Sequence, residues 1–115
     1  MKKIVFIFLV LFPASLLADA DAESICIAAS EKIASIIEDW YRLVQDVGAG
    51  AKNASVIAMH SDYKNGEFLK KYKYHCIENW KVYEDTYICF SGIRSELGAA
   101  MCLHPDTNKN GWSYW

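Results

Sequence analysis

The sequence has no large excess of charge of either sign, few glycines and prolines, and none of the short motifs typical of common catalytic sites. Its 115 residues carry 12 basic and 14 acidic side chains, a net charge of -2, which excludes a strongly basic nucleic-acid-binding protein. Six glycines and two prolines are too few for a collagen-like repeat. A hydrophobic content of 53% is too high for a disordered chain. The length allows one small domain with a single core.

Catalytic motifs are absent as well. There is no H-E-x-x-H pair, no G-x-S-x-G turn and no glycine-rich phosphate loop. His75 beside Cys76 is the pattern of an activated thiol, but we expect Cys76 to form a disulfide, and a disulfide sulfur is not a resting nucleophile. We therefore predict a protein that is not an enzyme and needs no cofactor.

The first twenty residues have the features of a signal peptide. Two lysines open the segment, an uninterrupted apolar run covers residues 4–12, and small residues follow around Ala18 and Ala20. A membrane-spanning helix needs about 20 apolar residues, whereas Pro13 interrupts this run. No cysteine precedes Cys26, so no lipid-attachment site follows the segment. We predict cleavage near Ala18 or Ala20 and no stable membrane insertion afterwards.

All four cysteines lie after the predicted signal peptide, at positions 26, 76, 89 and 102. An even number of cysteines in a small exported chain predicts two disulfides, because disulfides persist in oxidising compartments. Structural zinc sites instead use close pairs such as C-x2-C, which this chain lacks. We therefore expect a periplasmic or secreted protein with no metal.

Apolar residues recur at spacings of three and four over residues 22–47, which predicts an amphipathic helix. The residues of this stripe are Cys26, Ala29, Ile33, Ile36, Trp40, Leu43 and Val47. A second, shorter helix is expected to begin at Asn53 or Ser55, because both residue types cap helices. Asn65 and Gly66 end it.

Two further helices are expected over residues 67–80 and 85–103. No glycine or proline separates them, so a single continuous helix is the alternative. On one straight helix Cys76 and Cys89 would lie about 20 Å apart, beyond the reach of a disulfide. A turn over residues 81–84 would bring the two cysteines level, and we therefore predict one there.

Four helices with short connections predict an all-α, up-down-up-down bundle. In such a bundle Cys26 and Cys102 fall at one end, and Cys76 and Cys89 at the other. The predicted disulfides are therefore Cys26–Cys102 and Cys76–Cys89. In the chain-entropy model they would contribute about 4.5 and about 3 kcal/mol respectively.

The helical domain is expected over residues 21–105, followed by a polar turn and an aromatic tail over 106–115. Residues 106–111 match the first six positions of the calcium-loop pattern D-x-[DN]-x-[DN]-G. The bidentate glutamate of that pattern would come at its twelfth position, beyond Trp115. We therefore expect a polar turn, with a weak calcium-binding loop as the alternative.

Two aromatic clusters are candidates for contact with a partner protein, since aromatic side chains supply rigid contact area. The first combines tyrosines with positive charge on the third helix: Lys70, Lys71, Tyr72 and Tyr74. The second lies beyond the last helix: Trp112, Tyr114 and Trp115. This tail either folds back over the bundle or anchors a partner. Because the mature chain is acidic and exported, we expect the first cluster to contact no nucleic acid.

The segment Cys89-Phe90-Ser91-Gly92, followed by Cys102, resembles the C-[LF]-[SW]-G…C segment of the TrbM/KikA-type conjugal-transfer proteins. Those are small exported accessory proteins of plasmid-borne type IV secretion systems. The resemblance covers residues 89–102, and Tyr87 and its neighbours stand where the family has a further cysteine. No functional residue is carried over from the family.

We therefore expect a non-enzymatic exported protein that binds another cell-envelope protein. The resemblance implies an accessory of a conjugation or type IV secretion apparatus. One alternative is a periplasmic inhibitor or immunity protein against a secreted cell-wall hydrolase. Another is a carrier of a small apolar ligand, with Trp40, Trp80 and Tyr87 lining its pocket.

Overall fold

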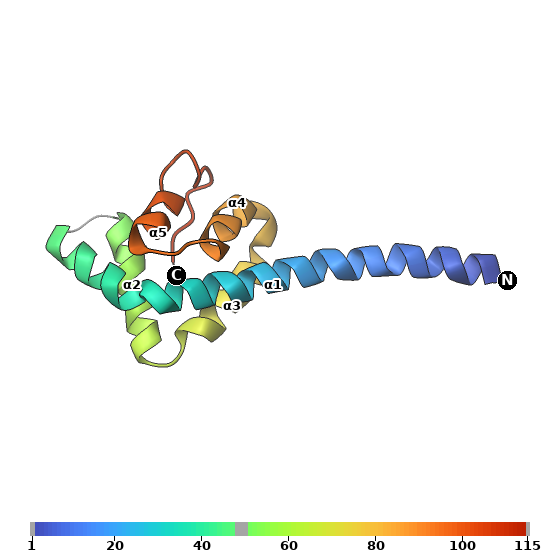
Figure 1. Ribbon diagram of the computed structural model, residues 1–115, viewed down its shortest axis with the longest axis horizontal. Coiled ribbons are helices and arrows are strands. Elements are labelled where there is room, and N and C mark those ends of the chain that lie inside the picture. Colours follow the sequence, from blue (N-terminus) through green and yellow to red (C-terminus); the bar gives the residue numbers. More distant parts are fainter. Residues whose placement is uncertain (1, 48–50, 115) are drawn as a thin grey trace.

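The computed structural model describes residues 2–47 and 51–114, and side chains over 21–45 and 53–114. Over these residues the protein is all-α, with five helices and no strand (Figure 1). The helices are α1 (Lys2–Val47), α2 (Ala51–Lys64), α3 (Phe68–Glu78), α4 (Trp80–Ser91) and α5 (Glu96–Cys102). The predicted all-α class with two disulfides is confirmed.

The long helix α1 gives the molecule its elongated shape, 66 × 31 × 23 Å. The other helices surround its second half, whereas its first half projects away from them (Figure 1). The predicted signal peptide corresponds to this projecting half. None of the described helices combines the length and apolar character needed to cross a membrane.

The core-facing stripe of α1 lies close to its predicted positions. Cys26, Ala29, Ile33 and Trp40 are buried, as expected. The stripe then continues through Val44, and Leu43 is instead 45% exposed. A spacing of 3.6 residues per turn accounts for this difference, because four residues separate Trp40 from the next position on the same face. Val47 lies outside the described side chains.

Helix α2 starts earlier than predicted, at Ala51 rather than at Asn53 or Ser55, and ends at Lys64. The predicted end at Asn65–Gly66 is confirmed. Gly66 has a φ of 76°, a left-handed conformation that glycine adopts without the steric penalty of a Cβ atom. This turn sends α3 back along α1.

The break between α3 and α4 lies at Asn79, before the predicted turn over residues 81–84. The side-chain amide of Asn79 donates to the carbonyl of His75 at 2.9 Å, and its backbone N–H donates to the same oxygen. These bonds satisfy a carbonyl that the ending helix would leave unpaired. Tyr83, within the predicted turn, marks a kink inside α4.

The predicted fourth helix is two helices in the structure. Helix α4 ends at Ser91, with Gly92 as its C-cap. The hydroxyl of Ser95 then accepts a hydrogen bond from the backbone N–H of Gly98 at 3.2 Å, which caps α5. A serine cap satisfies one of the free N–H groups at a helix start. The described residues thus form five helices rather than the expected four.

The predicted disulfide pairing is wrong. The bonds are Cys26–Cys76 and Cys89–Cys102, with Cα atoms 5.8 and 5.6 Å apart. Because the chain breaks at Asn79, Cys76 lies one turn before the break and Cys89 nearly three turns after it, a difference in height of about 10 Å. The reversal between α4 and α5 then brings Cys102 beside Cys89. Cys26 lies near the middle of α1 rather than at an end of a bundle, so it meets α3.

Aromatic rings fill the centre of the fold. Tyr72 of α3, Tyr87 and Phe90 of α4, and Trp112 of the tail are all buried. The ring centroid of Trp112 lies 5.2 Å from that of Phe90, 6.2 Å from that of Tyr72 and 6.3 Å from that of Tyr87, all near edge-to-face. Such tilted contacts are favourable for aromatic pairs. The C-terminal tail therefore completes the core.

Candidate functional site

The predicted cluster on α3 does not form one face. Lys70 and Tyr74 are exposed, but Tyr72 is fully buried. The Nζ atom of Lys71 lies 3.1 Å from Oδ1 of Asp62 on α2, so Lys71 serves as a link between α2 and α3. Of the four predicted residues, Tyr72 therefore belongs to the core and Lys71 is exposed but paired with Asp62. Lys70 and Tyr74 are exposed four positions apart on α3, on the same side of the helix.

Helical geometry explains this division. Phe68, Tyr72 and Cys76 recur every four residues and form the buried stripe of α3. Lys70 and Tyr74 lie two positions further along and so face the opposite side. The tyrosines at 72 and 74 look equivalent in the sequence but point in nearly opposite directions.

The tail aromatics lie inside the molecule. Trp112 and Tyr114 are 3% and 8% exposed, so neither side chain is accessible to a partner in this arrangement. The hydroxyl of Tyr114 donates to Oδ2 of Asp62 at 2.8 Å, and its backbone N–H donates to the hydroxyl of Ser55 at 2.9 Å. Burial, followed by the bond to Asp62, raises the pKa of Tyr114. Trp115 lies outside the described residues.

An accessible apolar surface exists at a place that we did not predict from the sequence. We call it the α1–α3 face, made of Ile27, Leu69, Lys70, Lys73, Tyr74 and Ile77. Its large hydrophobic side chains lie off the buried stripes, and Leu69, Tyr74 and Ile77 are 50%, 61% and 42% exposed. Leu69 and Ile77 both fall outside the four-residue repeat of α3, and that mismatch is the signal that could have revealed them.

Two hollows border the α1–α3 face. The smaller, of about 350 Å³, is lined by Ile27, Ser30, Glu31, Leu69, Lys70 and Lys73. The larger, of about 580 Å³, is lined by Ala22, Glu23, Ile77, Glu78, Asn79, Trp80, Lys81, Val82 and Glu84. Nζ of Lys73 lies 3.2 Å from Oε1 of Glu23, so an ion pair joins the rims of the two hollows.

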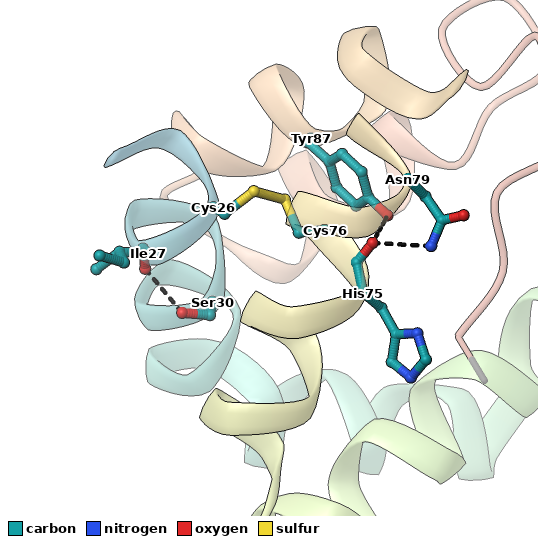
Figure 2. The surroundings of a disulfide bond; sticks show 7 residues. All are labelled: Cys26, Ile27, Ser30, His75, Cys76, Asn79 and Tyr87. Carbon is teal, nitrogen blue, oxygen red and sulfur yellow. Dashed lines mark hydrogen bonds between the residues drawn. A yellow bond between two sulfur atoms is a disulfide. The ribbon is translucent and has the colours of Figure 1, made fainter. Parts of the chain in front are cut away.

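A buried disulfide supports the α1–α3 face from below. Cys26 and Cys76 join α1 to α3, the two helices that present it, and both are fully buried. Their next neighbours in the chain, Ile27 and Ile77, are exposed, and Figure 2 shows Ile27 directed away from the disulfide. The covalent link therefore fixes the spacing of the two helices that present this face. A surface held in this way loses little conformational freedom when a partner binds.

A second polar cluster joins α1 to α2. Oε1 of Glu38 lies 2.7 Å from Nζ of Lys64, and Oε2 lies 3.2 Å from Nε2 of His60. The ring of His60 stacks on that of Tyr41 with centroids 3.7 Å apart. Hydrogen bonds from Lys64 and then His60 lower the pKa of the Glu38 carboxyl. Because these groups pair with one another across the two helices, the cluster acts as an interhelical clamp. The isolated His60 gave no sign of this clamp in the sequence.

The residues of the calcium-like segment hold the tail. Oδ1 of Asn108 accepts from the hydroxyl of Thr86 and from the backbone N–H of Trp112. The amide of Asn110 donates to the carbonyl of Val82 at 2.6 Å. Both side chains therefore tie the turn to α4. Within the described side chains, no group of three or more His, Cys, Asp or Glu residues has the arrangement of a metal site.

The three aromatics expected around a ligand pocket do not line a common one. Trp40 borders a hollow of about 180 Å³ together with Val44 and Leu103. Trp80 borders the larger hollow beside the α1–α3 face. Tyr87 is fully buried next to Trp80, with their rings parallel and 6.2 Å apart. Trp40 and Trp80 thus line separate hollows.

No protein-family model, curated protein or solved structure matches this chain. Support for a functional proposal therefore comes from the described residues, above all from the α1–α3 face.

Proposed function

We propose that this is a non-enzymatic exported protein that binds another cell-envelope protein through the α1–α3 face. The observation that carries the proposal is the exposure of Leu69, Tyr74 and Ile77 together on one short helix. The interior is meanwhile filled by other aromatic and aliphatic side chains. Contiguous apolar surface rimmed by polar groups is typical of protein interaction sites.

The composition of the face also suits a protein partner. Tyr74 supplies a large, rigid side chain of the kind that dominates binding energy in many interfaces. Lys70 and Glu31 lie at the edge, where interfaces usually carry charge. The disulfide between Cys26 and Cys76 holds the face in a fixed shape.

The cellular setting follows from the cysteines. Two disulfides are typical of proteins in oxidising compartments. Together with the predicted signal peptide, they support a location in the periplasm or outside the cell. We therefore place the partner in the cell envelope.

Within this class we favour an accessory protein of a conjugation or type IV secretion apparatus. The resemblance to TrbM/KikA-type proteins rests on Cys89 to Gly92 and on Cys102, and these two cysteines are bonded to each other. The alternative, an inhibitor or immunity protein against a cell-wall hydrolase, would use the same face. Neighbouring genes separate the two, because transfer genes support the first and a secreted hydrolase gene supports the second.

The test is a crosslinked pull-down from envelope extract with the oxidised, processed protein and two double variants. Leu69→Asp with Ile77→Asp places charge on the α1–α3 face. Leu97→Asp with Met101→Asp makes the same change on α5, where the side chains are 70% and 63% exposed. We expect one captured protein to be lost with the first variant and retained with the second.

Each variant must keep both disulfides and a cooperative unfolding transition, which mass spectrometry and thermal melting establish. Equal capture by the wild type and the α3 variant would overturn the proposal. Loss of capture with the α5 variant alone would show that the binding surface lies on α5 instead.

A further inference from the structure

The larger hollow, at the turn between α3 and α4, carries an excess of negative charge. Three carboxylates line it, from Glu23, Glu78 and Glu84, against one ammonium group, from Lys81. Glu23 already pairs with Lys73. The excess therefore lies with Glu78 and Glu84, which are both exposed. A positively charged ligand would therefore have a favourable electrostatic interaction with this hollow.

An aromatic ring and apolar walls accompany these carboxylates. Trp80 is half-buried, and its ring lies parallel to that of Tyr87 at 8°. Tyr87 is fixed in turn by the core and by a 3.5 Å hydrogen bond from its hydroxyl to the carbonyl of His75 (Figure 2). Ile77 and Val82 add exposed apolar surface beside Trp80.

This combination matches the chemistry of arginine and lysine side chains. Their charged ends pair with carboxylates and are attracted to the face of a tryptophan ring. Their methylene stems pack against apolar surface. The volume of about 580 Å³ falls within the usual range of ligand sites, about 300–1,000 Å³.

We propose that this hollow binds a segment of the partner protein that carries an arginine or lysine flanked by apolar residues. The proposal rests on the proposed function, because the hollow adjoins the α1–α3 face at Ile77. The partner then contacts the face with apolar residues and inserts a basic residue at Trp80. An acidic segment is rejected, because Glu78 and Glu84 repel it.

The probe is a short capped peptide of alternating leucine and arginine, titrated into the oxidised protein and followed by amide and indole NMR signals. A peptide of alternating leucine and glutamate is the matched control. We expect saturable shifts at Trp80, Ile77 and Val82 with the arginine peptide, weakening as salt rises, and none with the glutamate peptide. Equal shifts with both peptides, or none with either, would overturn the proposal.

Charge variants sharpen this test in opposite directions. Glu78→Gln with Glu84→Gln removes the excess negative charge, and we expect the arginine peptide to bind about fivefold more weakly or worse. Lys81→Gln removes the opposing cation and should strengthen binding by about twofold or more. Glu67→Gln with Glu96→Gln changes the net charge equally at a distance and should leave affinity unchanged. If this control variant weakens binding equally, the loss of affinity reflects the net charge of the protein alone, and the proposed site is refuted.

Two further outcomes identify what fails. Agmatine, a small guanidinium compound, tests whether the cation must belong to a protein segment. If agmatine binds as tightly as the peptide, the hollow is a site for small amines, and the proposal that a protein segment occupies it is refuted. If the pull-down depends on Leu69 and Ile77 but not on Glu78 and Glu84, the protein-binding function stands and this inference fails. If capture depends on neither pair, the proposed function itself fails.

Discussion

The side-chain amide of Asn108 hydrogen bonds to both backbone polar groups of Trp112. Oδ1 accepts from the backbone N–H at 2.7 Å, and Nδ2 donates to the carbonyl at 3.0 Å. The hydroxyl of Thr86 donates to the same Oδ1 at 3.1 Å. One asparagine thus closes the C-terminal turn and attaches it to α4, which positions the Trp112 ring in the core.

Replacement of Asn108 by alanine should loosen the tail. Three hydrogen bonds are lost, each with a net value of about 1 kcal/mol, so we expect a loss of roughly 2–4 kcal/mol in the free energy of unfolding. Urea denaturation with tryptophan fluorescence measures it. Asn110→Ala is the matched control, since it removes a single bond to Val82. A smaller loss for Asn108 than for Asn110 would contradict this account of the tail.

Two buried tyrosines provide a matched comparison. Among the residues that the structure describes, the buried hydroxyl of Tyr72 has no hydrogen-bond partner, whereas that of Tyr114 donates to Asp62. Tyr72→Phe should therefore leave the free energy of unfolding unchanged within about 0.5 kcal/mol or raise it, because an unsatisfied polar group is removed. Tyr114→Phe should lower it by roughly 1–3 kcal/mol. Urea denaturation of both variants measures these changes. A larger loss of stability for Tyr72→Phe than for Tyr114→Phe would show that the Tyr72 hydroxyl has a hydrogen-bond partner.

Much of the fold was predictable because it depends on local patterns. The stripe through Ile33 and Trp40 follows helical periodicity, and Gly66 ends α2 through its own backbone freedom. The disulfide pairing was not predictable in this way. The pairing depends on the chain turning at Asn79 rather than within the predicted turn over residues 81–84. No glycine or proline marks either place in the sequence.

The candidate site was less predictable than the fold. Leu69 and Ile77 are aliphatic like many core residues, and the one sequence signal that sets them apart is their position off the four-residue repeat of Phe68, Tyr72 and Cys76. Tyr72 and Tyr74 also look alike in the sequence, but two positions along a helix place them on nearly opposite sides, so that Tyr72 is buried and Tyr74 is exposed. The charge of the hollow at Trp80 also depends on the turn at Asn79, which brings α3 and α4 residues together.

Stability should fall at alkaline pH because three tyrosines are held in their neutral form. Burial raises the pKa of Tyr72, Tyr87 and Tyr114 above the usual value near 10. Above about pH 10 the unfolded chain releases these protons while the folded chain retains them. The free energy of unfolding should therefore decrease as pH rises past that point. Urea midpoints from about pH 9 to about pH 11 measure this, and an unchanged midpoint would contradict the burial of these hydroxyls.

The clamp between α1 and α2 predicts a local titration. Hydrogen bonds from Lys64 and His60 hold the pKa of Glu38 below its usual value. The stabilisation from this carboxylate is therefore present above the pKa of the unfolded chain and is lost as pH falls through the lower folded value. In Lys64→Met the pKa of Glu38 should rise, whereas Arg42→Met, which removes the partner of Asp39, should leave it unchanged. Carbon-detected NMR of the Glu38 carboxyl distinguishes these outcomes.

The two disulfides should differ both in accessibility and in contribution to stability. Cys26 and Cys76 are fully buried, whereas Cys89 is partly accessible, so limited reduction should open Cys89–Cys102 first. Peptide mapping after alkylation measures the order.

Separations of 50 and 13 residues correspond to about 4 and about 3 kcal/mol in the chain-entropy model. Serine replacement of Cys26 and Cys76 together should therefore cost more stability than replacement of the other pair, and it should also loosen the α1–α3 face. Partner capture then provides a separate measurement, because removal of the Cys89–Cys102 bond leaves α1 and α3 joined. Equal loss of capture in both double variants would show that the bond beneath the face does not act by holding its two helices at a fixed spacing.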